Sequence, residues 1–74
     1  MSNRKTVHWT GKNSKQAFDM LEKIGDELTL VYDGYRSKNG LSLACSHEGY
    51  RSRRVIKLVS WTKHVAIVRF EGMV

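Results

Sequence analysis

A six-residue pattern occurs twice in the chain, and its residue types are suited to phosphate binding. Residues 33–38 read DGYRSK and residues 48–53 read EGYRSR, the same order of acid, Gly, Tyr, Arg, Ser and base. An Arg guanidinium can hold a phosphate through two hydrogen bonds, and a Ser hydroxyl can add another. A Tyr ring offers a face on which a base or sugar stacks. Since these residues are also common in turns, two ordinary turns are the other interpretation.

The positive charge of the chain is unevenly distributed along the sequence. The formal net charge is +6. Residues 1–34 hold five basic and five acidic side chains, whereas residues 35–74 hold eight basic and two acidic ones. A surplus confined to one half of the chain indicates a cationic surface patch, and such a patch attracts a polyanion. A basic face that merely interacts with solvent is the alternative.

The leading hypothesis is a nucleic-acid-binding protein that contacts phosphates through its basic C-terminal half. We favour DNA, and exposure of Tyr35, Tyr50 or Trp61 would favour a single strand or RNA. With five or six phosphates neutralised, log K should fall against log salt with a slope of roughly −5. The predicted contact residues are Tyr35, Arg36, Lys38, Tyr50, Arg51, Arg53, Arg54 and Lys57, with Lys63 and Arg69 adding to the field.

The charge counts also predict which substitutions weaken binding. Loss of Arg51, Arg53 and Arg54 should have the largest effect. Loss of Lys12, Lys15 and Lys23 should have much less, because acids on the first predicted helix offset them; Asp19, for example, could pair with Lys15 or Lys23.

A second hypothesis belongs to another functional class. The chain could be a small interaction or inhibitor protein that docks on an acidic surface of a protein partner, such as a nucleic-acid-processing enzyme. Arg and Tyr are enriched at protein interfaces as well, so the same residues fit both hypotheses.

Catalysis and cofactor binding lack the residue patterns they require. Cys45, His8, His47 and His64 show no spacing typical of zinc ligands, so we expect no metal and a buried core role for Cys45. Four acids lie on or just after the first predicted helix, on its solvent side, and no nucleophile–base arrangement is indicated. We therefore predict no cofactor and no enzymatic activity.

The length and composition predict one small basic α+β domain over residues 1–74. A single cysteine excludes an internal disulfide, and no apolar run approaches the length of a membrane span. With no secretory h-region after the first residues, we expect a cytoplasmic protein without a membrane partner. The oligomeric state stays open.

The elements that position these residues follow from periodicity and turn signals. We predict a strand over 6–10 and a helix over 14–24, with Asn13 and Gln16 forming a capping box. Further strands are predicted over 27–33, 41–46, 54–61 and 65–70, with a hairpin turn at Asn39-Gly40. The fold class is α+β: a small antiparallel β-meander of three to five strands, in the order β-α-β-β-β-β, with one amphipathic helix on one face.

This arrangement leaves the other sheet face open and places the two repeated turns at opposite ends of the sheet. A strand of about seven residues would separate them by roughly 20–25 Å, so a ligand shared by both must be long. Trp9 is expected in the core, and the position of Trp61 is left open.

Overall fold

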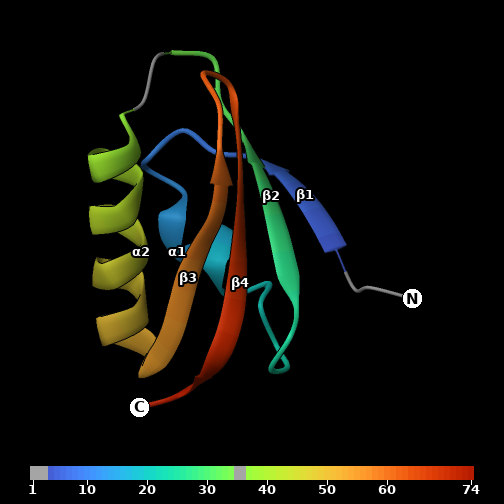
Figure 1. The fold of residues 1–74 in the computed structure, drawn as a ribbon, viewed down its shortest axis with the longest axis vertical. Helices are drawn as coiled ribbons and strands as arrows, with labels where there is room; N and C mark the ends of the chain where they lie inside the picture. Colours follow the sequence, from blue (N-terminus) through green and yellow to red (C-terminus); the bar gives the residue numbers. More distant parts are fainter. Residues whose placement is uncertain (1–3, 35–36) are drawn as a thin grey trace.

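The chain folds into a four-stranded sheet with helices, shown in Figure 1. A computed structural model describes residues 4–34 and 37–74. The elements are β1 (Arg4–His8), α1 (Ser14–Phe18), β2 (Glu27–Val31), α2 (Lys38–Ser52), β3 (Arg54–Trp61) and β4 (Val65–Met73). The predicted α+β class is confirmed, whereas the predicted element order is only partly correct.

The sheet is mixed, with strand order β1-β2-β4-β3. β1 and β2 run parallel, while β2 pairs with β4 and β4 with β3 in antiparallel fashion. Adjacent parallel strands need a crossover connection, and the segment containing α1 supplies it. The prediction of an antiparallel meander is therefore wrong for the first pair. It is correct that the three strands after the first helix pair only in antiparallel fashion with one another.

The largest correction concerns residues 38–52, which form α2 instead of a hairpin turn and a strand. Asn39 and Gly40 lie in the first helical turn, and the Ser37 hydroxyl at the N-cap accepts a hydrogen bond from the Gly40 N–H (3.0 Å). Leu41 and Cys45, four residues apart, are both buried on one helix face. The segment contains no Val, Ile or Thr, unlike β3 and β4, and this absence is the signal that separates helix from strand here.

α1 is shorter than predicted, and side chains from other elements bind carbonyl groups at its end and just after it. The helix ends at Phe18. Arg54 Nη1 donates to the Phe18 carbonyl (3.0 Å), and Lys5 Nζ donates to the Met20 carbonyl (3.1 Å). Ile24, predicted on the buried face of a longer helix, is exposed.

The first turn of α1 differs from the predicted capping box. Asn13 is the N-cap residue as predicted, but its side chain makes no cap hydrogen bond. Its amide instead bonds to the preceding loop, accepting from the Thr10 N–H (2.9 Å) and donating to the His8 carbonyl (2.8 Å).

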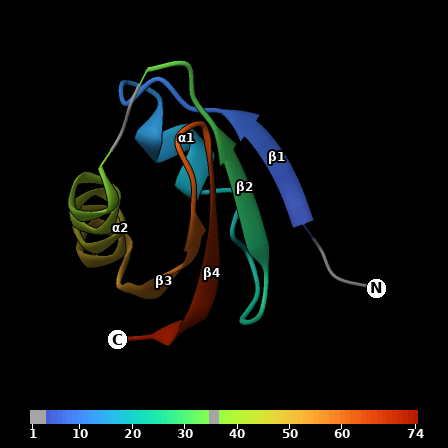
Figure 2. The same ribbon diagram turned by 45° about the horizontal axis from the view of Figure 1, so that its top comes forward.

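The core lies between the helices and one face of the sheet. α1 packs against that face and α2 runs along the β3 side (Figures 1 and 2). Trp9 is 3% exposed and packs edge-on against Phe18 and Tyr32, which confirms its predicted core position. Trp61 is half-buried against the same core. Because both helices lie on or beside this face, the opposite face of the sheet is left uncovered.

Candidate functional site

Each of the seven Asp and Glu side chains lies against a basic side chain or a backbone donor. Asp26 accepts from the Glu22 and Lys23 N–H groups (3.0 and 2.9 Å). The other six lie within ion-pair distance of basic side chains: Asp19 of Arg51 and Arg54, Glu22 of Lys5, Asp33 of His8, Glu48 of Arg51, and Glu27 and Glu71 of Arg69. None of these seven side chains lies within ion-pair distance of the other described Lys and Arg side chains.

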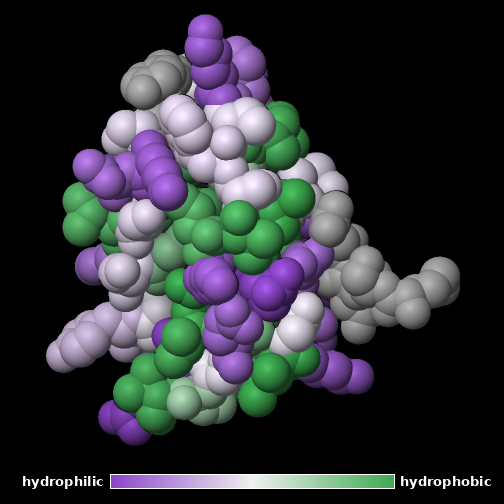
Figure 3. Space-filling view, viewed as in Figure 1, coloured by the Kyte–Doolittle hydropathy of each residue, from purple (hydrophilic) through white to green (hydrophobic). Residues whose placement is uncertain are grey.

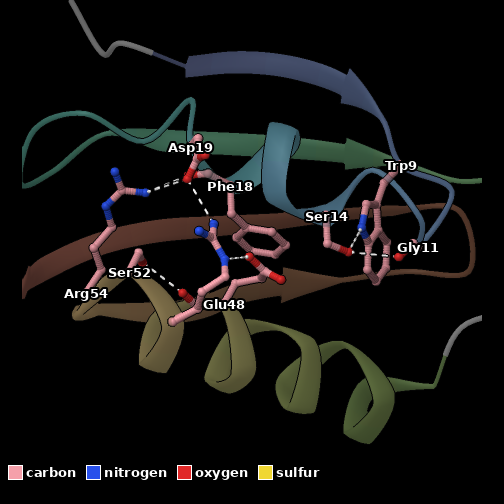
Figure 4. A network of polar contacts seen from close by, with 9 residues as sticks. Trp9, Gly11, Ser14, Phe18, Asp19, Glu48, Ser52 and Arg54 are labelled. Carbon is pink, nitrogen blue, oxygen red and sulfur yellow. Dashed lines mark hydrogen bonds and ion pairs between the residues drawn. The ribbon is translucent and has the colours of Figure 1, made fainter.

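The densest of these contacts joins α1, α2 and β3 (Figure 4). Arg51 donates to Glu48 (2.7 Å) and to Asp19 (3.0 Å), and these hydrogen bonds, with Glu48 the larger cause, raise the pKa of Arg51. Arg54 Nη1 lies 3.6 Å from Asp19, and its guanidinium stacks over the Phe70 ring at 5.5 Å. The prediction that Asp19 pairs with Lys15 or Lys23 is wrong.

Three of the predicted phosphate contacts are thus engaged inside the protein. The Arg54 side chain is 19% exposed, and Arg51 is held by two carboxylates. Arg69 lies on the uncovered sheet face and pairs with Glu27 at 3.0 Å. A phosphate bound by any of these three arginines would compete with a carboxylate partner already in place.

Seven described Lys and Arg side chains have no carboxylate within ion-pair distance. Four of them surround α2: Lys38 begins it, Arg53 follows its end, and Lys12 and Lys15 line a groove beside it. The full set is Lys12, Lys15, Lys23, Lys38, Arg53, Lys57 and Lys63. Sequence reasoning missed Lys12 and Lys15, because nothing in the local sequence shows that Asp19 binds arginines from the other half of the chain.

The groove beside α2 has a volume of about 560 Å³. Lys12 and Lys15 line one side of it, and Leu43, His47 and Glu48 of α2 line the other. Hydrogen bonds hold the loop that carries Lys12: Trp9 Nε1 donates to Ser14 Oγ (2.8 Å), and Ser14 Oγ donates to the Gly11 carbonyl (3.1 Å), as Figure 4 shows. Lys12 on this loop and Lys15 in α1 are therefore presented beside α2 by a segment anchored on the core.

The outward face of α2 carries neutral side chains. Leu43 is 71% exposed and Tyr50 is 88% exposed, at positions opposite the buried Leu41 and Cys45 on the helix. The neutral residues of this face are Asn39, Leu43, Ser46, His47 and Tyr50, all exposed, and the exposed charged residues of α2 are Lys38 and Arg51. The one acid of α2, Glu48, is buried, so this face shows no negative charge.

The two copies of the repeated pattern occupy different structures. The first copy leads into α2, with Ser37 as N-cap and Lys38 as first helical residue; Tyr35 and Arg36 lie outside the described residues. The second copy forms the last turns of α2, and Arg53 ends the helix in the left-handed conformation (φ 57°). The interpretation of each copy as a turn that follows a strand is therefore wrong for the second.

The uncovered sheet face is mainly β-branched. Figure 3, which looks onto it, shows hydrophobic side chains across the middle of the sheet and a hydrophilic group below them. Lys57 and Arg69 are the predicted site residues on this face, paired across β3 and β4. The described side chains of the face include no Phe, Tyr or Trp. They include Thr6, His8, Glu27, Thr29, Val31, Val55, Lys57, Val59, Ser60, Val65, Ile67 and Arg69.

Cys45 is buried as predicted, although in a helix instead of a strand. Burial raises the pKa of its thiol to about 12, so the thiolate that binds metals or attacks electrophiles is disfavoured. Among the described residues, no three His, Cys, Asp or Glu side chains are grouped where they could hold a metal ion.

Within the described residues, neither helix has the length and apolar character needed to cross a membrane. Comparison of the chain with protein-family models, with curated proteins and with solved structures finds no match. The function is therefore inferred from the arrangement of charges around α2.

Proposed function

We propose that the chain binds nucleic acid through the surface around α2. The observation that carries this proposal is the position of four unpaired cations, Lys12, Lys15, Lys38 and Arg53, around a helix face without a negative group. Polyanion binding needs cations that are free to neutralise phosphates, and none of these four has an Asp or Glu side chain within ion-pair distance.

The spacing of the cations favours a long ligand over a small anion. Lys38 and Arg53 stand at the two ends of a 15-residue helix. At about 1.5 Å per residue they are separated by roughly 22 Å, far more than one phosphate group can span. A nucleic-acid backbone presents phosphates over that distance. Lys57 and Lys63, exposed on β3 and in the turn after it, extend the positive field.

Duplex DNA is favoured over a single strand. Proteins that bind single strands without sequence preference combine a cationic groove with several aromatic side chains on which bases stack. Tyr50 is exposed, but Trp61 is half-buried, and the described part of the uncovered sheet face offers no aromatic ring except the imidazole of His8. One isolated ring supports fewer stacked bases than such a surface does.

The test is a fluorescence anisotropy titration near physiological salt with a short DNA duplex, one of its strands and the matching RNA. We expect a dissociation constant of about 10⁻⁶ M or tighter for the duplex, and weakening by at least about 10-fold in the variant Lys12→Ala/Lys38→Ala/Arg53→Gly. Glycine suits the left-handed conformation of Arg53, so that substitution removes charge without strain. The control is Lys23→Ala, which removes one unpaired cation in the turn after α1. Binding of all three probes weaker than about 10⁻⁴ M would overturn the proposal.

Docking on an acidic protein surface is the second candidate. Leu43 and Tyr50 are exposed on α2, and Val31, Val65 and Ile67 lie on the uncovered sheet face. Exposed apolar side chains beside cations are also suited to a protein interface. Retention of a defined acidic protein by the immobilised chain, together with failure to bind the three nucleic-acid probes, would select this candidate.

A further inference from the structure

The solvent face of α2 has a pattern that a simply solvated helix lacks. A surface helix normally carries charged and polar residues at its most exposed positions. The most exposed positions of α2 instead carry Leu43 and Tyr50, with Asn39 and His47 beside them. The charged residues stand at the margins of this strip.

The two margins lie on opposite sides of the helix. On one side, Lys12 and Lys15 share a groove with His47 and Ala44 of α2. On the other side, Lys38 shares a hollow with residues 58–61 of β3. The neutral strip of Asn39, Leu43, Ser46, His47 and Tyr50 therefore runs between two cationic borders, and Arg53 stands at its end.

The major groove of B-form DNA has the complementary arrangement. It is about 12 Å wide and is bordered on both sides by phosphates, while its floor presents the uncharged edges of the bases. An α-helix with its side chains is about 10–12 Å across and fits this width. A neutral helix face with cations on both borders thus matches the groove in charge as well as in width.

We propose that α2 enters the major groove of duplex DNA and that its neutral strip contacts base edges. This proposal rests on the proposed function. The Asn39 amide can pair with the N6 and N7 groups of adenine, and His47 can donate to an acceptor such as guanine N7. Leu43 provides an apolar contact for a thymine methyl group. Lys12, Lys15 and Lys38 bind the phosphates on the two sides and set the position of the helix.

The test begins with selection of bound duplexes from a random DNA library by the wild-type chain. We expect one enriched motif. The variants Asn39→Ala and His47→Ala should then each lose about 5- to 150-fold in affinity for that motif, and little for unrelated duplex. His64→Ala, an exposed His in the turn between β3 and β4, is the matched control and should keep the wild-type affinity.

Base analogues identify the groove. Replacing guanine in the motif by 7-deazaguanine removes a major-groove acceptor, whereas replacing it by inosine removes the minor-groove amino group. We expect weaker binding with the first change and not with the second. The reverse result, or equal affinity of the strip variants and wild type for the motif, overturns the major-groove proposal.

These outcomes are separate from failure of the proposed function. If duplex, single strand and RNA bind equally and no motif is enriched, nucleic-acid binding stands and the major-groove proposal fails. If none of the three binds, the proposed function itself fails.

Discussion

The partition of cations into paired and unpaired groups leads to a quantitative prediction for the variant Lys12→Ala/Lys15→Ala. Both side chains lack a carboxylate partner and line the groove beside α2. Each phosphate contact to B-form DNA contributes about −0.9 to the slope of log K against log salt. Loss of both lysines should therefore flatten the slope by roughly 1.8.

The four unpaired cations around α2 set the wild-type value. Four phosphate contacts correspond to a slope of about −3.6, and therefore to a loss of affinity of about 150-fold between about 50 and about 200 mM salt. The double variant, with a slope near −1.8, should lose only about 12-fold over the same range. The assay is an anisotropy titration of one labelled duplex at several salt concentrations, after circular dichroism has shown that each variant is folded.

The comparison variant is Arg51→Ala/Arg69→Ala, which removes the same amount of charge. Both arginines are bound to carboxylates of the chain itself. Their loss should lower affinity at low salt through the general field but change the slope by less than about 0.5, because no phosphate contact disappears. A steep slope in the lysine variant combined with a flattened slope in the arginine variant would refute the partition. It would instead support the prediction made from the charges of residues 1–34 and 35–74, in which the basic residues of the second half contact the phosphates.

Three further predictions concern the fold that positions α2. In Gly49→Ala, the added Cβ would stand 2.6 Å from the Arg54 carbonyl oxygen. Although Ala has the better helix propensity, we expect this contact to lower the free energy of unfolding, measured in urea, by about 1–3 kcal/mol. Unchanged stability would contradict the contact. Since the pKa of Cys45 is raised to about 12 by folding, the thiolate forms first in the unfolded chain. Stability should then be unaffected below about pH 8.5 and fall by up to about 1.4 kcal/mol per pH unit from there toward pH 12. Cys45→Ala should remove that part of the pH dependence, and an identical profile in the variant would show that other groups cause it. Tyr32→Phe removes the hydroxyl that donates to the Thr62 carbonyl (2.6 Å). In the same assay, its free energy of unfolding should be about 0.5–1.5 kcal/mol below that of the wild type, and an equal value would contradict this prediction.

Local patterns predicted most of the strands and the start of the first helix. β3 and β4 are rich in Val and Ile, and β2 shows the alternating burial expected from a period of two. Local patterns also predict Asn13 as an N-cap residue and Trp9 as a core residue, and both predictions are confirmed. These properties depend on neighbouring residues, so they can be read without knowing the fold.

Residues 41–45 show why the same method failed for α2. Leu41 and Cys45 are an even number of positions apart, which fits one face of a strand, and also four positions apart, which fits one face of a helix. Leu43 favoured the strand because it completed an alternation of apolar residues at positions 41, 43 and 45. In the structure it is exposed, since the outward side of α2 faces solvent and not the core.

The sequence by itself determined the surplus of positive charge, and its local patterns predicted an α+β structure with Cys45 buried. Which cations are free was decided only by the tertiary structure. Asp19 lies 32 positions from Arg51 in the sequence, yet the packing of α1 against α2 brings their side chains to 3.0 Å. An ion pair depends on distance in space, and chain folding sets that distance. The acids of the first half therefore neutralise arginines of the second and leave Lys12 and Lys15 free beside α2.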